Sequence, residues 1–257
     1  MNKILSIITV NKDAAEDLLL TINSLAPILT WDKIEFIIVD GLSSDKSISV
    51  INDNKGYISK FISEPDSGIY DAMNKGISMS SGDWLWFLNS GDQSRINLRD
   101  LKNIFLDINK NVNFIYSDFF INNNTIIKQT LSHFALMRGM INHQSIFYKR
   151  NLFGRYDLSY KSTADFAHLL SNFKLIKAKK ISPPLSEYNL FGISSSFKKK
   201  DRVGIWFFRM LAFRKANINF FFKISGFIFC FITCFVKIFS PTFGSNIIKL
   251  RKDLEGL

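Results

Sequence analysis

The sequence is poor in the residues that build zinc sites and disulfide frameworks. It has 257 residues, with two cysteines and three histidines. Cys230 and Cys234 are four residues apart in an apolar stretch, so they share one helix face, where a mutual disulfide is hard to close. No further Cys or His lies near enough in the chain to complete a zinc site. We interpret both cysteines as apolar packing residues in a reducing compartment.

Two common phosphate-binding motifs are also missing. The first apolar run, Leu5–Val10, is followed by Asn11–Ala15 and not by a glycine-rich turn, which excludes a dinucleotide fingerprint. No G-x-x-x-x-G-K-[ST] pattern occurs, which excludes a P-loop. If a nucleoside diphosphate binds, a metal ion must therefore neutralise much of its charge.

Signal peptides and membrane-spanning runs are lacking as well. The apolar run near the start is too short for a signal peptide with a cleavage site, so we expect a cytoplasmic protein. The uncharged stretch Ile224–Val236 has 13 residues between two lysines, whereas a spanning helix needs about 20 apolar residues. Phe220–Phe239 reaches that length only by including both lysines.

Positive charge and phenylalanine gather instead at the C-terminal end. Residues 198–257 carry twelve Lys and Arg against three Asp and Glu, and hold 12 of the 26 Phe residues. Because these Phe residues cluster with Ile, Leu and Val, the segment favours lipid over nucleic acid. We predict that residues 198–252 attach to an anionic membrane surface, and that Arg202, Arg209 and Arg214 form the basic face of a helix over 202–216. The alternative is that these helices pack on the rest of the protein.

Apolar runs of strand length alternate with helix-like stretches over the first part of the chain. The strand-like runs are Leu5–Val10, Ile34–Val39, Tyr57–Ile62, Trp84–Leu88 and a run beginning at Phe114. Helix-like stretches over 14–25, 45–51, 69–80 and 98–108 separate or follow them. This order predicts an α/β fold with a mostly parallel sheet covered by helices on both faces.

Polar residues follow four successive strands of this predicted sheet. They are Thr9 and Asn11, then Asp40, then Glu64 and Asp66, then Asn89 and Asp92. Ligands of open α/β sheets bind outside the carboxyl ends of the strands. We therefore expect these side chains to meet in one site.

Four motifs together carry a family resemblance. Ser6–Val10, Ile37–Asp45, Glu64–Gly76 and Leu88–Asp92 resemble family 2 glycosyltransferases, and more narrowly the small bacterial enzymes that build lipopolysaccharide O-antigen, colanic acid or capsule. The resemblance is close over about the first hundred residues and looser over 141–196. It implies a Rossmann-like GT-A catalytic domain over 1–197, with a nucleotide-sugar half (1–110) and an acceptor half (111–197). Residues 198–257 would then form a helical membrane-associating tail.

The resemblance also implies roles for residues on the nucleotide side. Asp40 would accept a hydrogen bond from the nucleobase, with the backbone of Thr9, Val10 and Asn11 near the same ring. Asp66 would lie near the base or ribose. UDP is favoured over GDP by family habit alone.

Asn89 and Asp92 occupy the position of the family's DxD-type metal motif. The resemblance makes Asp92 the metal-binding carboxylate and directs Asn89 towards the ribose, with Mg²⁺ or Mn²⁺ as the ion. Asn89 replaces a first Asp, so it supplies an oxygen without the charge. The alternative is that Asn89–Asp92 is an ordinary turn.

Asp165 and His143 are the candidates on the acceptor side. Thr163–Leu170 resembles the family segment in which an Asp opens a helix beside the acceptor, so Asp165 is the expected catalytic base. The helix dipole favours its ionised form. His143 would contact the diphosphate or the acceptor, and the alternatives are structural roles for both residues.

The whole pattern predicts an inverting glycosyltransferase that moves a sugar from a nucleotide-sugar to a polyprenyl-linked saccharide at the cytoplasmic face of the bacterial inner membrane. The rival hypothesis is a non-catalytic nucleotide-binding membrane subunit, suggested by Asn89 and by Phe191-Gly192, where relatives have two glycines. Nucleotidyl transfer on a related sheet is a third possibility.

Overall fold

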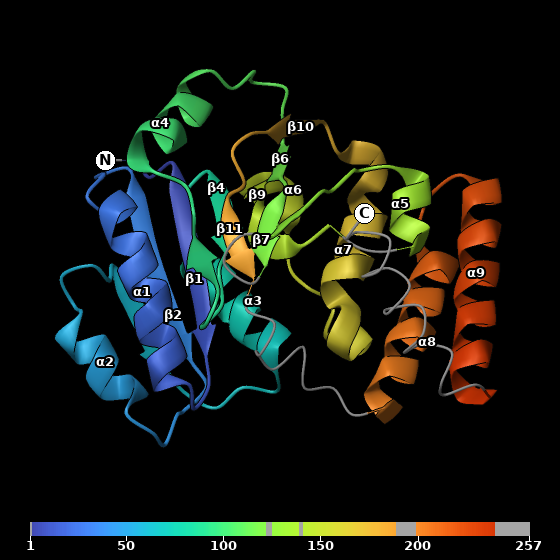
Figure 1. Cartoon of the computed structure of the whole chain (residues 1–257), viewed down its shortest axis with the longest axis horizontal. Coiled ribbons are helices and arrows are strands. Elements are labelled where there is room, and N and C mark those ends of the chain that lie inside the picture. Colours follow the sequence, from blue (N-terminus) through green and yellow to red (C-terminus); the bar gives the residue numbers. More distant parts are fainter. Residues whose placement is uncertain (1, 122–124, 139–140, 189–198, 240–257) are drawn as a thin grey trace.

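A mostly parallel sheet forms the centre of the molecule (Figure 1). The structure is a computed structural model that describes residues 2–121, 125–138, 141–188 and 199–239. The central sheet has seven strands in the order β10-β6-β9-β4-β1-β2-β3. They are β1 (Leu5–Asn11), β2 (Ile34–Asp40), β3 (Lys60–Ser63), β4 (Trp84–Phe87), β6 (Phe114–Ser117), β9 (Ile146–Lys149) and β10 (Ala178–Ile181). All five predicted strands are present, and β1 to β4 are parallel to their neighbours among these four, as expected.

Helices cover both faces of this sheet because the strands are apolar on both sides. Ile7 belongs to one buried cluster and Ile8 to the other, as the alternation of strand side chains requires. The first cluster includes side chains of α1 (Ala15–Leu29), α2 (Ser47–Asp53) and α4 (Leu98–Leu106). The second includes α3 (Ile69–Met79), α5 (His133–Arg138), α6 (Arg150–Phe153) and α7 (Ala164–Asn172). The predicted α/β architecture is confirmed.

Strand β9 is antiparallel to its neighbours, so its first residue lies at the edge of the sheet where the parallel strands end. It is antiparallel to both β4 and β6, with Trp86 opposite Phe147. The start of β9 therefore lies beside the end of β4, and the preceding 3₁₀ turn His143–Ser145 lies at the carboxyl end of the parallel strands. A second sheet has the order β5-β11-β7-β8, formed by Gln93–Ser94, Ser186–Tyr188, Phe119–Ile121 and Thr125–Ile127.

Helices α8 (Lys199–Lys215) and α9 (Phe220–Phe239) lie at the end of the molecule away from α1 and α2 (Figure 1). They pair closely: a Cβ on Gly226 would come within 2.3 Å of the Phe213 ring. The same Phe213 packs on Phe166 of α7, with ring centroids 5.6 Å apart. Helix α8 thus packs on the rest of the fold. The expected domain boundary at residue 197 and the Phe191-Gly192 segment lie outside the described residues, as do residues 240–252 of the predicted membrane segment.

The prediction that Arg209 lies on an exposed basic face is wrong. Its side chain is buried, with the guanidinium 4.3 Å from the Phe166 ring centroid and 4.6 Å from that of Trp206. It also donates a hydrogen bond to the Leu136 carbonyl over 2.9 Å. Stacking between aromatic rings lets a guanidinium be buried without losing its charge. Within the described residues, no helix is both long and apolar enough to cross a membrane.

Candidate functional site

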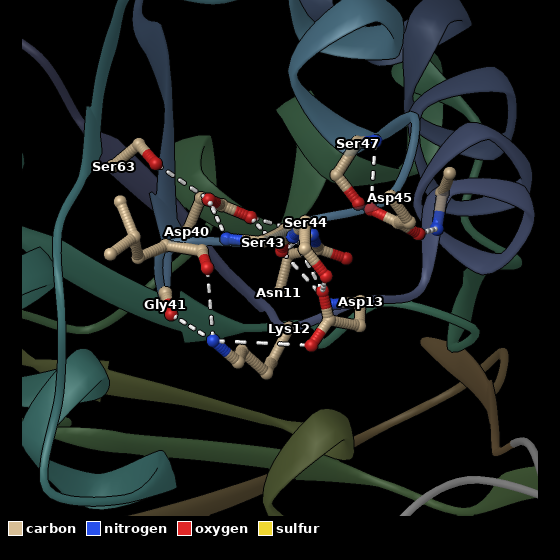
Figure 2. Close-up of polar contacts among 12 residues, drawn as sticks. Asn11, Lys12, Asp13, Asp40, Gly41, Ser43, Ser44, Asp45, Ser47 and Ser63 are labelled. Atoms are coloured by element: carbon tan, nitrogen blue, oxygen red, sulfur yellow. Dashed lines mark hydrogen bonds and ion pairs between the residues drawn. The ribbon is translucent and has the colours of Figure 1, made fainter.

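Asp40, at the end of β2, is the centre of a buried hydrogen-bond network (Figure 2). One carboxylate oxygen accepts from the Asn11 amide at 2.9 Å and from the Ser43 hydroxyl at 2.5 Å. The other accepts from the Ser43 backbone N–H at 2.9 Å and the Ser63 hydroxyl at 2.7 Å. Burial raises the pKa of Asp40, but the hydrogen bonds from Ser43, Ser63 and Asn11 outweigh it and lower that pKa. Asp40 is therefore an ionised group that holds the ends of β1, β2 and β3 together.

The loops after β1 and β2 are tied to each other next to Asp40 (Figure 2). The Lys12 ammonium donates to the Gly41 carbonyl at 2.5 Å. Asp13 accepts from the Ser44 backbone N–H at 2.7 Å, and Asp45 accepts from the Ala15 N–H at 2.9 Å, at the start of α1. These contacts hold the two loops in a defined arrangement at this edge of the sheet.

Asp66 lies directly against the turn that follows Asp40. A Cβ built on Gly41 would come within 2.5 Å of an Asp66 carboxylate oxygen, so only glycine leaves room for this approach. The other Asp66 oxygen accepts from the Gly68 N–H at 2.9 Å, and Gly68 has φ 129°. Asp66 therefore lies beside the residue that follows Asp40 in the chain.

The turn Asn89–Asp92, after β4, is hydrogen-bonded to Thr21 of α1. The buried Thr21 hydroxyl donates to the Asp92 carbonyl at 2.8 Å and accepts from the Gly91 N–H at 3.0 Å. The Ser90 hydroxyl donates to the Asn11 side-chain oxygen at 2.8 Å. Since Asn11 also donates to Asp40, one network joins the ends of β1, β2 and β4.

The Asp92 carboxylate is positioned by the turn before β9. One of its oxygens accepts from the Gln144 amide at 2.8 Å. Gln144 is in turn fixed through its backbone, because its carbonyl accepts from the Trp86 indole at 2.7 Å. The antiparallel β9 is what brings this turn to Asp92.

His143 lies between Asn89 and Asp165. Its Nε2 is 3.3 Å from the Asn89 side-chain nitrogen, and its Nδ1 is 3.4 Å from an Asp165 carboxylate oxygen. Asn89 Oδ1 is buried and has no hydrogen-bond partner among the described residues. Residues from three separate parts of the chain thus meet at this point.

Asp165 opens α7 and remains ionised. Burial raises its pKa, but hydrogen bonds from His143 and Tyr70, together with that from the Phe166 N–H, outweigh it and lower the pKa. Tyr70 is itself buried, and burial next to Asp165 raises the pKa of its phenol well above the usual value. The side chain of Asp165 is 13 % exposed, so it is mostly buried but retains some contact with solvent.

The oxygen atoms at the Asn89–Asp92 turn suit a hard divalent cation. Asp92 supplies a carboxylate, and the Asn89 side-chain oxygen lacks a partner among the described residues. In the described part of the chain, no group of three or more His, Cys, Asp or Glu could hold a metal ion. A carboxylate and an amide oxygen are ligand types that suit Mg²⁺ or Mn²⁺, ions that commonly keep several waters and take few protein ligands.

Several site residues are not identified from the sequence. Ser43, Ser63 and Ser90 hold the carboxylate and amide side chains in place, but serine is common in loops and gives no signal.

Thr9 and Val10 are buried, and the Thr9 hydroxyl donates to the Leu88 carbonyl at 2.6 Å. Their predicted role through the backbone stays a prediction, as do the ligand contacts expected of the other site residues.

Comparison with known proteins identifies the family. The model of the family described as "Glycosyl transferase family 2" matches residues 6–167. The chain belongs to glycosyltransferase family 2. The matched region contains all the polar residues named above after the first four strands, and it ends two residues after Asp165.

Among curated family members, the chain is 39% identical over 88 residues to an uncharacterized glycosyltransferase of Mycobacterium tuberculosis, covering 34% of each chain. It thus spans about a third of the length of this relative. It is 30% identical over 182 residues to a PGL/p-HBAD biosynthesis glycosyltransferase of Mycobacterium bovis, covering 63% of this chain and 68% of the relative.

Solved structures show the same GT-A fold. Staphylococcus aureus TarS 1–349 in complex with UDP-GlcNAc matches with a TM-score of 0.69 at 14% identity, over 87% of this chain and 70% of that one. The mannosyltransferase PcManGT of Pyrobaculum calidifontis, in complex with GDP-Man and Mn²⁺, matches with a TM-score of 0.58 at 15% identity, over 82% and 63%.

Proposed function

We propose that this protein is an inverting, metal-dependent glycosyltransferase. It transfers a sugar from a nucleotide-sugar, UDP-linked by family habit, to a polyprenyl-linked saccharide at the cytoplasmic face of the bacterial inner membrane. The observation that carries the proposal is the meeting of Asn89, Asp92, His143 and Asp165 at one edge of the sheet. The complexes of structural neighbours with UDP-GlcNAc, and with GDP-Man and Mn²⁺, support it.

Asp92 and Asn89 would hold the divalent ion together with the diphosphate. When bound, Mg²⁺ or Mn²⁺ stabilises the charge that develops on the nucleoside diphosphate as the sugar leaves, an effect typically worth several kcal/mol. Gln144 orients Asp92 through the 2.8 Å hydrogen bond. In this proposal Asp40 and Asp66 contribute to binding the nucleoside, with Asp40 held by Ser43 and Ser63.

Asp165 would act as the base that takes the proton from the acceptor hydroxyl. Its lowered pKa keeps it ionised near neutral pH, and a carboxylate on the acceptor side matches what direct displacement with inversion requires. Tyr70 and His143 both donate to it. These hydrogen bonds help to orient the carboxylate for the approaching hydroxyl.

The face of α9 that points away from the fold supports attachment to a membrane. Its apolar side chains recur every three or four residues, so they share one side of the helix. They are Phe220, Phe221, Ile224, Ile228, Phe231, Ile232 and Phe235, each between 42% and 80% exposed. A contiguous apolar face on a strongly basic segment fits insertion into an anionic bilayer surface. Such attachment would hold the enzyme beside a lipid-linked acceptor.

A panel of nucleotide-sugars tests the proposal. Purified protein incubated with a polyprenyl-diphosphate-linked sugar and Mn²⁺ should release nucleoside diphosphate from one donor and form a product of inverted configuration. Metal-dependent nucleotide binding without turnover on any donor would favour the non-catalytic subunit, and pyrophosphate release would favour nucleotidyl transfer. Full activity in Asp92→Ala would overturn the metal role.

A further inference from the structure

His143 makes two contacts of different kinds, and together they determine which way the Asn89 amide faces. Nδ1 is 3.4 Å from the Asp165 carboxylate, and Nε2 is 3.3 Å from the Asn89 nitrogen. A carboxylate accepts hydrogen bonds and an amide nitrogen donates them. The neutral imidazole with its proton on Nδ1 satisfies both contacts at once.

The contact with His143 also determines where the Asn89 side-chain oxygen points. Because Nε2 accepts from the Asn89 nitrogen, the amide oxygen must point away from His143. That oxygen, Asn89 Oδ1, is buried and has no hydrogen-bond partner among the described residues. A buried acceptor without a partner destabilises the free protein, so a ligand that supplies a donor or a cation there gains affinity.

We propose that His143 is a positioning residue that presents the Asn89 oxygen to the nucleotide-sugar. This deepens the proposed function and rests on it. The oxygen takes an electron-poor partner brought by the donor substrate, either a ribose hydroxyl or the divalent ion on the diphosphate. Asp165 takes part indirectly, since it fixes the proton on Nδ1 of His143.

The side chain at position 89 needs an orienting partner because it is an amide. A carboxylate offers an oxygen whichever way it is turned, whereas an amide offers one in only one of two orientations. The dependence on His143 should therefore disappear when Asn89 is replaced by aspartate. This gives an internal control for the proposal.

The test is calorimetric titration of UDP into the full chain, with and without Mn²⁺. His143→Ala should weaken UDP binding roughly tenfold, the size of effect typical for the loss of a partner that orients a metal ligand. In the Asn89→Asp background the same change should cost less than about threefold, because coupled residues are not additive. His143→Gln, whose amide oxygen can accept from Asn89, should restore part of the affinity. His133→Ala is the matched control, because His133 packs on Phe173 and Phe222.

Each outcome of the titrations either supports or overturns the role proposed for His143. A loss seen only with Mn²⁺ assigns the oxygen to the cation, and a loss seen in both arms assigns it to the ribose hydroxyl. Wild-type affinity in His143→Ala overturns the inference and leaves the proposed function intact. An equal loss in the Asn89→Asp background also overturns it, since His143 would then act on the nucleotide or on the fold. If the unmutated protein binds no nucleoside diphosphate, the proposed function fails, and the inference with it.

Discussion

The Gln144 amide holds one oxygen of the Asp92 carboxylate at 2.8 Å, inside the buried edge of the sheet. The two residues are 52 positions apart. They meet because β9 runs antiparallel to β4, so that the turn before β9 lies beside the turn after β4. This pairing gives the proposed metal ligand a fixed direction.

Gln144→Ala should therefore weaken metal-dependent binding of UDP. We expect a loss of about tenfold, at the lower end of what removal of an outer partner of a metal ligand costs. Affinity for UDP without metal should stay within about twofold of wild type, which serves as the internal control. Unchanged affinity in the presence of Mn²⁺ would show that Gln144 does not orient Asp92.

Asp165→Asn separates chemistry from binding. The amide oxygen can still accept from His143 Nδ1, so UDP binding should be retained. The base is lost, so kcat for sugar transfer should fall by about 10²- to 10⁴-fold. Single-turnover assays beside calorimetry provide both measurements, and a kcat within twofold of wild type would remove Asp165 from the proposed role.

Thr21→Val tests the support of the Asn89–Asp92 turn. Valine fills the same space but removes the hydroxyl that donates to the Asp92 carbonyl at 2.8 Å and accepts from the Gly91 N–H at 3.0 Å, leaving that N–H only the Asp17 carbonyl at 3.1 Å. The free energy of unfolding in urea should fall by about 1–3 kcal/mol. Thr30→Val is the control, because its hydroxyl bonds the Pro27 carbonyl at the surface. Equal losses in the two variants would argue against a special role for Thr21.

Glu35 should give the protein a steep loss of stability in acid. Burial raises its pKa, but hydrogen bonds from Ser6, Ser81 and Lys60 outweigh it and lower the pKa to about 2. A carboxylate with a lowered pKa stabilises the fold above its unfolded pKa, and this contribution is lost as the pH falls towards the folded value. From the two values, 4.5 and about 2, the contribution is about 3 kcal/mol.

Glu35→Gln should reduce the pH dependence of the free energy of unfolding between pH 4.5 and 2, as measured by urea unfolding at a series of pH values; the remainder would come from carboxylates such as Asp40 and Asp165, whose pKa values are also lowered. Glu16→Gln, at an exposed position, is the control and should retain the wild-type slope. A wild-type slope in Glu35→Gln would mean that other groups govern acid unfolding.

The exposed face of α9 should determine membrane binding. Phe221 and Phe231 are 80% and 54% exposed, and replacing both by serine should reduce partitioning onto phosphatidylglycerol-rich vesicles by at least about tenfold. Phe61→Ser is the control, because Phe61 is 42% exposed on β3, at the edge of the central sheet. Co-sedimentation at low and high salt measures both variants, and equal binding by the double variant and wild type would exclude this face.

The strands, and the edge of the sheet where the polar residues gather, are predictable from the sequence because both follow from local patterns. Continuous apolar runs specify β1, β2 and β4, and the polar residues after them necessarily reach one edge. The direction of β9 is not predictable in this way, because a four-residue apolar strand has the same pattern in either orientation.

Other features depend on tertiary contacts that no local pattern reveals. Arg209 appears in the sequence as a surface cation, yet it is buried between two aromatic rings contributed by α7 and α8. Tyr70 reaches Asp165 from α3. The link between Asn89 and Asp165 requires the antiparallel strand β9, which brings the preceding turn with His143 beside the end of β4.

The most direct test of the account is calorimetric titration of UDP into wild-type protein and Asp92→Ala, with Mn²⁺ and then with the metal removed by EDTA. The account predicts that wild type binds UDP tightly only with Mn²⁺, and that Asp92→Ala binds with the same weak affinity in both conditions. Tight, Mn²⁺-dependent binding by Asp92→Ala would contradict it.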